Sequence, residues 1–135
     1  MRLKPAKLRQ TEGMSMRILW MLALLAGPAA AQEFEPKASD QVLDAAAMAA
    51  QVVGRTHEFF DGGVSFFSVS GIYTYTYNDG ARAYGEWQLR DDGAGGVICT
   101  SFEAGFSRCD MYVHDGTRLV LITEDGTRFP VRAES

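Results

Sequence analysis

Apolar and polar residues alternate along much of the chain after residue 60. In residues 72–77, tyrosines alternate with isoleucine and threonine, and residues 84–90 alternate again, with Trp87 and Leu89 on one face. A period of two is typical of a β-strand with one buried face. We therefore expect seven short strands, at residues 64–69, 72–77, 84–90, 97–102, 106–113, 118–123 and 127–132.

Polar turn sequences separate these segments. Asn-Asp-Gly occurs at 78–80, Asp-Asp-Gly at 91–93, and Asp-Gly at 115–116 and 125–126. Asp-Gly between two alternating segments is the strongest short-range indication of a β-hairpin. The sequence thus predicts a mainly β fold of the α+β class, in which one N-terminal helix precedes an antiparallel meander that curls into a sandwich or a partial barrel.

The acidic turns can be compared with calcium-binding loops, because Asp-Gly-Thr-Arg occurs at 115–118 and again at 125–128. A calcium loop supplies several oxygen ligands at fixed spacing, as in D-x-D-x-D-G with a distal Glu. No such run is present. We interpret both segments as turns, and we expect neither a metal site nor a cofactor.

A helix is expected at residues 40–53, before the first strand. Ser39 or Asp40 would cap it, and Gly54 would end it. Its apolar positions repeat at helical spacing and form one stripe, made of Val42, Leu43, Ala46, Ala49, Ala50 and Val53.

Cys99 and Cys109 are expected to form a disulfide that staples a hairpin. If residues 103–105 form a three-residue loop with Gly105 in the left-handed conformation, Cys99 lies directly opposite Cys109. Side chains opposite each other in antiparallel strands are close enough for a disulfide. A redox pair usually has Cys-x-x-Cys spacing, and a zinc site would need both histidines of the chain, so we favour the structural disulfide.

The same register places Val97 and Met111 on the cysteine face of the hairpin. We therefore expect this face to point into the core. The expected core residues are Trp87, Leu89, Val97, Met111, Val113, Leu119 and Leu121.

The N-terminus has the pattern of a secretory signal peptide. Arg17 precedes nine apolar residues at 18–26, and small residues at 29–31 precede Gln32. Nine apolar residues are too few to span a bilayer, which needs about 20. We expect a signal peptide at 1–31, a flexible leader at 32–39, and one β-rich domain at 40–135. The sequence leaves three candidates for the first residue of the translated chain, Met1, Met14 and Met16.

Removal of the signal peptide changes the charge of the protein. The full chain has 13 basic and 17 acidic residues, whereas the segment from Gln32 onward has 8 and 16, a net charge of −8. Nucleic acids and anionic lipids are bound through Lys and Arg. The acidity therefore argues against both kinds of partner, and we expect no membrane span after cleavage.

Two histidines and a row of tyrosines are the candidate functional residues. His57 precedes Glu58 and His114 precedes Asp115, so either histidine could act as a general base. Neighbouring side chains on a strand point to opposite faces, which favours a structural role for both. The predicted ligand-binding residues are aromatic, because tyrosine offers apolar area with a polar tip: Tyr73, Tyr75, Tyr77 and Tyr84, with Trp87 and Arg82 expected nearby.

The order of several short motifs resembles a known group. A Gly-x-Tyr strand begins at Gly71, a Gly-x-Trp-x-Leu strand begins at Gly85, and a hairpin with Cys99 and Cys109 follows. This order, over about residues 54–131, resembles the DUF995-like group of small exported bacterial proteins of unknown function. The resemblance implies an exported bacterial β domain, and it transfers no activity and no functional residue.

No catalytic motif stands out in the sequence. We therefore expect a periplasmic or secreted module with a binding or structural role and no catalysis, whose partner is an unknown small molecule, glycan or protein. The alternative is a small hydrolase or lyase that uses His57 or His114 as its general base.

Processing is the first testable expectation. The intact mass of the protein from the extracytoplasmic fraction should correspond to a chain that begins at Gln32. Soluble protein that retains residues 16–31 would contradict the signal-peptide interpretation.

Overall fold

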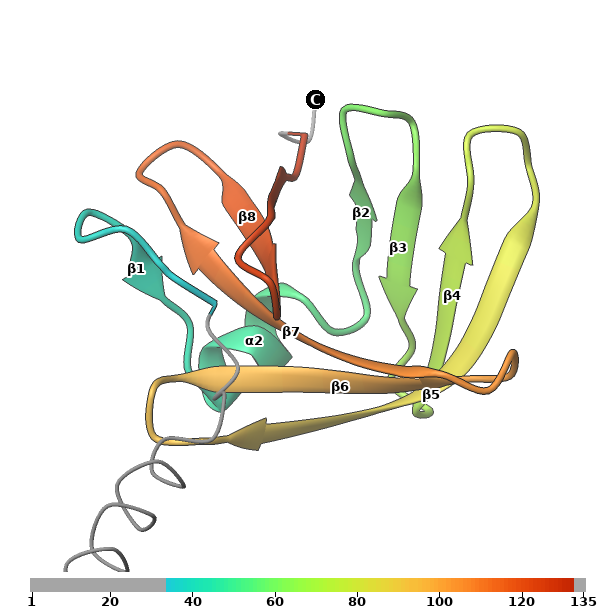
Figure 1. Ribbon diagram of the computed structural model, residues 1–135, viewed down its shortest axis with the longest axis horizontal. Coiled ribbons are helices and arrows are strands. Elements are labelled where there is room, and N and C mark those ends of the chain that lie inside the picture. Colours follow the sequence, from blue (N-terminus) through green and yellow to red (C-terminus); the bar gives the residue numbers. More distant parts are fainter. Residues whose placement is uncertain (1–33, 133–135) are drawn as a thin grey trace, which may run out of the picture. The chain divides into compact units, whose positions relative to one another are not determined.

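The structure, a computed structural model, describes residues 34–132. These residues form nine β-strands and one short helix (Figure 1). The predicted signal peptide and the first residues of the leader lie outside this range. The elements are β1 (Gln41–Val42), α2 (Ala45–Gln51), β2 (Thr56–Glu58), β3 (Val64–Phe67), β4 (Ile72–Thr76), β5 (Arg82–Asp91), β6 (Gly96–Phe102), β7 (Ser107–His114), β8 (Leu119–Thr123) and β9 (Arg128–Pro130).

The sheet is an antiparallel meander that curls into a half-barrel. Strands β2 to β9 lie side by side in their order along the chain. The curl is strong enough for the two edges to meet, because Phe59, just after β2, forms an isolated bridge with Val131, just after β9. The N–H of Arg132 also donates to the carbonyl of Glu58 at 2.8 Å. The predicted mainly β fold, with one N-terminal helix and an antiparallel meander that forms a partial barrel, is confirmed.

All seven predicted strands are present, with ends that differ from the expected ones by a few residues. Two strands were not predicted. β2 has only three residues, Thr56–Glu58, and β1 has two. Segments this short carry too few residues to show a period of two, so their strand pairing depends on neighbours far away in sequence.

The predicted start of the helix is wrong. Residues 41 and 42 are extended, because Gln41 pairs with His114 and Val42 with Val113 of β7. The helix begins at Ala45, and the carboxylate of Asp44 caps it by accepting the N–H of Ala47 at 2.8 Å. The pairing with β7 overrides the helical spacing that the sequence suggests.

Asp40 has a different role from the predicted cap. Its carboxylate, almost fully buried, accepts two hydrogen bonds from the guanidinium of Arg128, at 2.7 and 3.0 Å. This pair ties the segment before β1 to β9, and the bonds from Arg128 lower the pKa of Asp40.

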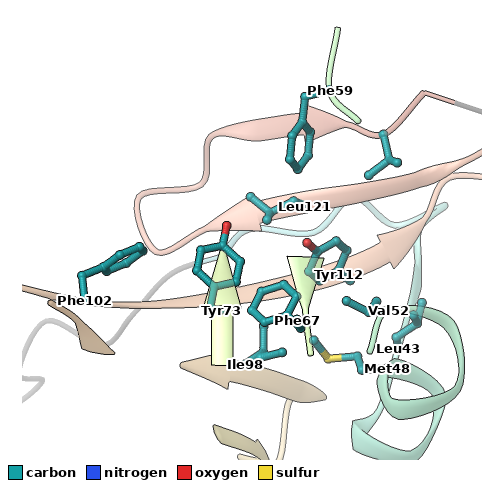
Figure 2. Packing of buried hydrophobic residues seen from close by; sticks show 11 residues of the cluster. Leu43, Met48, Val52, Phe59, Phe67, Tyr73, Ile98, Phe102, Tyr112 and Leu121 are labelled. Carbon is teal, nitrogen blue, oxygen red and sulfur yellow. The ribbon is translucent and has the colours of Figure 1, made fainter. Parts of the chain in front are cut away.

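The helix buries a different face from the expected stripe. Met48 and Val52 are fully buried, whereas Ala46, Ala49 and Ala50 face solvent. Helix α2 lies against β5 and β6, and Figure 2 shows Leu43, Met48 and Val52 grouped beside it. The helix therefore closes one end of the inner face with two large side chains, with Ala47 packed beside them, and the three exposed alanines do not contribute to the core.

The sheet has apolar cores on both faces. The inner core contains Leu43, Met48, Val52, Phe59, Phe67, Tyr73, Ile98, Phe102, Tyr112, Leu121 and Val131 (Figure 2). The outer core contains Phe34, Val97, Met111, Val113, Val120 and Ile122, with Cys99 and Cys109 packed against it. The segment before β1 covers this second face, since Phe34 is buried there and Val42 packs beside it.

The cysteine face points into a core, as expected, but this core is the outer one and is separate from the core that contains Trp87 and Leu89. The cysteines lie on the outer face, together with Val97 and Met111. Trp87 pairs with Thr100 and Leu89 with Ile98, so both lie on the inner face. The expected core residues are thus divided between two cores. Trp87 and Leu89 are partly buried at the margin of the inner one.

The predicted disulfide and its hairpin register are confirmed. Cys99 is bonded to Cys109 with 4.0 Å between their Cα atoms, and Ser101 lies opposite Ser107. Gly105 has the expected left-handed conformation, with φ of 102°. The disulfide joins the two central strands β6 and β7 on the outer face.

The interpretation of the acidic segments as turns is also confirmed. The carboxylate of Asp115 accepts the N–H groups of Thr117 and Arg118, both at 2.8 Å. Asp125 accepts the N–H of Thr127 at 3.0 Å and the hydroxyl of Thr123, and these bonds lower its pKa to about 2. Each carboxylate thus closes its own turn, as Asp commonly does.

Loss of the disulfide should destabilise the domain. Cys99→Ser is expected to lower the free energy of unfolding by about 2–4 kcal/mol, because the unfolded chain is no longer constrained. Chemical denaturation measures this, with Ser107→Ala, an exposed position of the same hairpin, as the control. Equal stability of Cys99→Ser and the wild type would contradict the structural role of the bond.

Candidate functional site

A cavity of about 220 Å³ opens on the inner face of the half-barrel. Seven of its twelve lining residues are aromatic: Phe59, Tyr73, Tyr75, Tyr77, Phe102, Phe106 and Phe129. They come from strands β4, β6 and β9 and from segments beside β2, β4 and β7, so the curl of the sheet brings them together. We call this the aromatic cavity.

The aromatic cavity has a buried floor and an exposed rim. Tyr73 and Leu121 on the floor are 1% and 4% exposed, whereas Tyr77 and Phe106 at the rim are 50% and 55% exposed. Large apolar side chains that remain this exposed around a concave site are typical of interaction surfaces. The cavity is therefore accessible from solvent on the side of Tyr77 and Phe106.

Ring-to-ring contacts hold the walls of the aromatic cavity in place. Tyr75 and Tyr77 meet edge to face at 4.9 Å between centroids, and Phe102 stacks on Phe106 at 4.5 Å. Both geometries are favourable for aromatic pairs. The walls are thus pairs of rings that support each other.

Gly63 allows Tyr75 to take its position. A β-carbon at residue 63 would collide with the hydroxyl end of Tyr75. The N–H of Gly63 donates to the carboxylate of Asp61 at 2.9 Å, and Asp61 also lines the cavity. Burial raises the pKa of Tyr75, and the nearby charge of Asp61 adds to the shift.

One ion pair borders the aromatic cavity. Arg108 lines it and binds Asp110 through two nitrogens, at 2.9 and 3.0 Å. The guanidinium also lies over the ring of Phe102, 5.7 Å from its centroid. Asp110 is fully buried, and burial raises its pKa to about 6 even though Arg108 opposes the shift.

Polar groups lie beside this ion pair on the inner face. The hydroxyl of Ser65 donates to the hydroxyl of Tyr73 at 3.0 Å. Three buried oxygens on β6 and β7 have no hydrogen-bond partner among the described residues: Thr100 Oγ1, Asp110 Oδ1 and Tyr112 Oη. Unpaired buried polar atoms are costly in a folded protein. Their clustering distinguishes this part of the inner face from an ordinary apolar core.

The structure brings together three of the four tyrosines predicted to bind a ligand. Tyr73, Tyr75 and Tyr77 all line the aromatic cavity. Tyr84 pairs with Thr74 and therefore lies on the opposite face of the sheet, where it is exposed. Arg82, which pairs with Thr76, shares the face of Tyr84. The expected cluster of Tyr84 and Arg82 with the tyrosine row is wrong, because both are out of phase with it.

Trp87 lies on the same face as the tyrosine row. Its ring meets Phe67 edge to face at 6.0 Å, and its Nε1 donates to the carbonyl of Ser68 at 2.8 Å. Helix α2 covers one end of this shared inner face and leaves the end with Tyr75 and Tyr77 open.

Sequence reasoning missed nine of the twelve residues that line the aromatic cavity, among them four phenylalanines and Arg108. Phe102 and Arg108 could have been found from the hairpin register, because they lie on the face opposite the cysteines. The same register places Phe106 opposite Phe102, whereas Phe59 and Phe129 give no local indication. Phe59 and Phe129 contact each other at 6.4 Å only because the edges of the sheet meet.

His57 and His114 line a second cavity, of about 310 Å³. His57 is buried, and its Nε2 lies 3.3 Å from the carbonyl of Val52. His114 Nδ1 accepts the N–H of Gly116 at 3.1 Å. The carboxylates that follow them in sequence are engaged elsewhere: Glu58 pairs with Arg132 at 3.2 Å, and Asp115 closes its turn.

Comparisons of the chain with protein-family models, curated proteins and solved structures gave no match. The resemblance to the DUF995-like group stays a prediction. Among residues 34–132, no helix has the length and apolar character needed to cross a membrane. The same residues contain no group of three or more His, Cys, Asp or Glu side chains arranged to hold a metal ion.

The carboxyl of Asp110 should titrate near pH 6. Because its folded pKa lies above the ordinary 3.8, the folded state holds this proton more tightly than the unfolded chain. Its contribution to stability is therefore complete below about pH 4 and is lost as the pH rises through about 6. Carbon NMR of the side-chain carboxyl measures the midpoint, and Asp110→Asn should remove this part of the pH dependence of unfolding. A midpoint at or below 3.8 would refute the assignment.

Proposed function

We propose that this protein is an exported, non-catalytic binding module that holds a small, mainly apolar, ring-containing molecule in the aromatic cavity. The observation that carries the proposal is the cavity itself, with its buried floor, exposed rim and seven aromatic side chains. A concave apolar site with a few polar groups is the usual form of a small-molecule site.

The size of the aromatic cavity favours one ring. An apolar cavity of about 150 Å³ in a protein core can hold benzene. The volume here, about 220 Å³, is sufficient for one substituted ring but small for a glycan chain or a folded partner. Among the partners that the sequence leaves open, a small molecule therefore has the most support.

The charges around the cavity favour a neutral ligand. The guanidinium of Arg108 is already paired with Asp110, and Asp61 adds a carboxylate at the wall. A neutral ring with a hydroxyl or carbonyl substituent can accept a hydrogen bond from Arg108 without leaving a charge buried and unpaired. Phenol is the simplest probe with these properties.

Export is part of the proposal. The signal-peptide pattern of residues 18–31 supports it, and so does the disulfide between Cys99 and Cys109, since disulfides form in oxidising compartments. An extracytoplasmic module that captures a small molecule needs no catalytic group.

The alternative function is that of a small hydrolase or lyase. One observation favours it, namely that His57 and His114 line the same cavity. Against it, their sequence neighbours Glu58 and Asp115 are engaged with other groups. Loss of a measured hydrolytic activity in His114→Gln would be the evidence for this alternative.

Removal of Tyr75 should weaken binding of a ring-shaped probe. In an NMR titration with phenol, Tyr75→Ala is expected to raise the dissociation constant about tenfold, the effect of losing an aromatic contact and its apolar area. Tyr84→Ala, on the opposite face, is the matched control and should bind phenol like the wild type.

A variant that fills the cavity separates binding from folding. Ala83 lines the cavity and is only partly buried, so Ala83→Leu should obstruct the site while all of its aromatic side chains are kept. Phenol shifts that persist unchanged in both Tyr75→Ala and Ala83→Leu, or their absence from the wild type, would refute the proposal.

A further inference from the structure

Three arginines converge on the second cavity. Arg55 comes from the segment between α2 and β2, Arg118 from the turn between β7 and β8, and Arg132 from the chain after β9. They line the cavity together with His57 and His114, and none of its nine lining residues is acidic. This cavity shares no lining residue with the aromatic cavity. We call it the arginine cavity.

Ring and hydrogen-bond contacts hold these arginines in place. The guanidinium groups of Arg118 and Arg132 both lie over the ring of Phe60, at 5.5 and 5.7 Å from its centroid. Arg55 donates through Nε to the carbonyl of Ala50 at 3.3 Å. Two of the positive charges are thus positioned by an aromatic ring and the third by a helix carbonyl.

Arg118 has an unsatisfied donor at this site. Its Nε is buried and has no hydrogen-bond partner within residues 34–132. A buried guanidinium nitrogen without an acceptor is unfavourable, and an anion that enters the cavity can supply one. His114 adds a further donor, because its Nδ1 accepts a hydrogen bond and the neutral ring then carries its proton on Nε2.

The nearby carboxylates offset the positive charge only in part. Glu58 pairs with Arg132 at 3.2 Å, but both side chains are about half exposed, so water screens the pair. Asp115 uses its Oδ1 to accept two backbone N–H groups. The chain from Gln32 onward has 16 acidic and only 8 basic residues, and three of these basic residues are the arginines at this one cavity.

We propose that the arginine cavity binds a phosphate-type oxyanion, either as a free ion or as the end group of a phosphomonoester. Guanidinium groups match the geometry of phosphate oxygens with paired N–H donors and keep their charge at all physiological pH values. Arg118 supplies the buried donor, and Arg55 and Arg132 approach from two other segments. This site is independent of the proposed function of the aromatic cavity.

Calorimetric titration with inorganic phosphate tests the proposal, at an ionic strength held constant with sodium chloride. The wild type should show saturable binding, and Arg118→Gln and Arg55→Gln should each weaken it about tenfold, because a charge-assisted hydrogen bond is lost. A parallel titration with glycerol 3-phosphate distinguishes the two sources. Tighter binding of the ester indicates an end group, and equal or weaker binding indicates the free ion.

Arg90→Gln is the matched control, since Arg90 is exposed and does not line the arginine cavity. It should bind phosphate like the wild type. If the thermal transition shows that Arg118→Gln does not fold, Arg55→Gln becomes the decisive variant, because Arg55 is exposed. Absence of saturable binding in the wild type, or an equal loss in Arg90→Gln, would overturn the proposal.

Discussion

The curl of the sheet is the constraint on which the rest of the structure depends. Strands β2 to β9 present an inner face with a large apolar core, yet the helix that can cover it has only seven residues. Burying a large apolar side chain contributes about 1.5–3 kcal/mol, so the sheet covers itself until Phe59 meets Val131. Helix α2 fills one end with Met48 and Val52, and the other end stays open as the aromatic cavity.

Three neighbouring strands of the sheet are buried on both sides. β6, β7 and β8 contribute Ile98, Tyr112 and Leu121 to the inner core, and Val97, Met111 and Val120 to the outer one. The segment with Phe34 and Val42 covers the outer core, and the disulfide joins β6 to β7 beneath it. These strands thus form a rigid wall on which Arg108 and Asp110 can be held against the aromatic cavity.

Local features of the fold could be predicted from the sequence, and features that depend on the curl could not. Alternation and Asp-Gly turns predicted seven strands, and Gly105 fixed the register that pairs Cys99 with Cys109. The start of the helix was missed, because strand pairing of Gln41 with His114 depends on residues 73 positions apart. The tyrosine row was predicted as a surface, but Phe59 and Phe129 are brought together beside it only by closure of the sheet. Strand phase alone would have separated Tyr84 from that row.

The two cavities divide the molecule by chemistry, one aromatic and nearly neutral, the other cationic. The inner face keeps an open apolar space beside Tyr73 and Tyr75, and the proposed binding function depends on it. Xenon binds empty apolar cavities, so it tests for this space without any assumption about the ligand. A crystal of the protein pressurised with xenon should show a xenon atom among Tyr73, Tyr75 and Leu121. Side chains that close this space and leave no xenon site there would contradict the account.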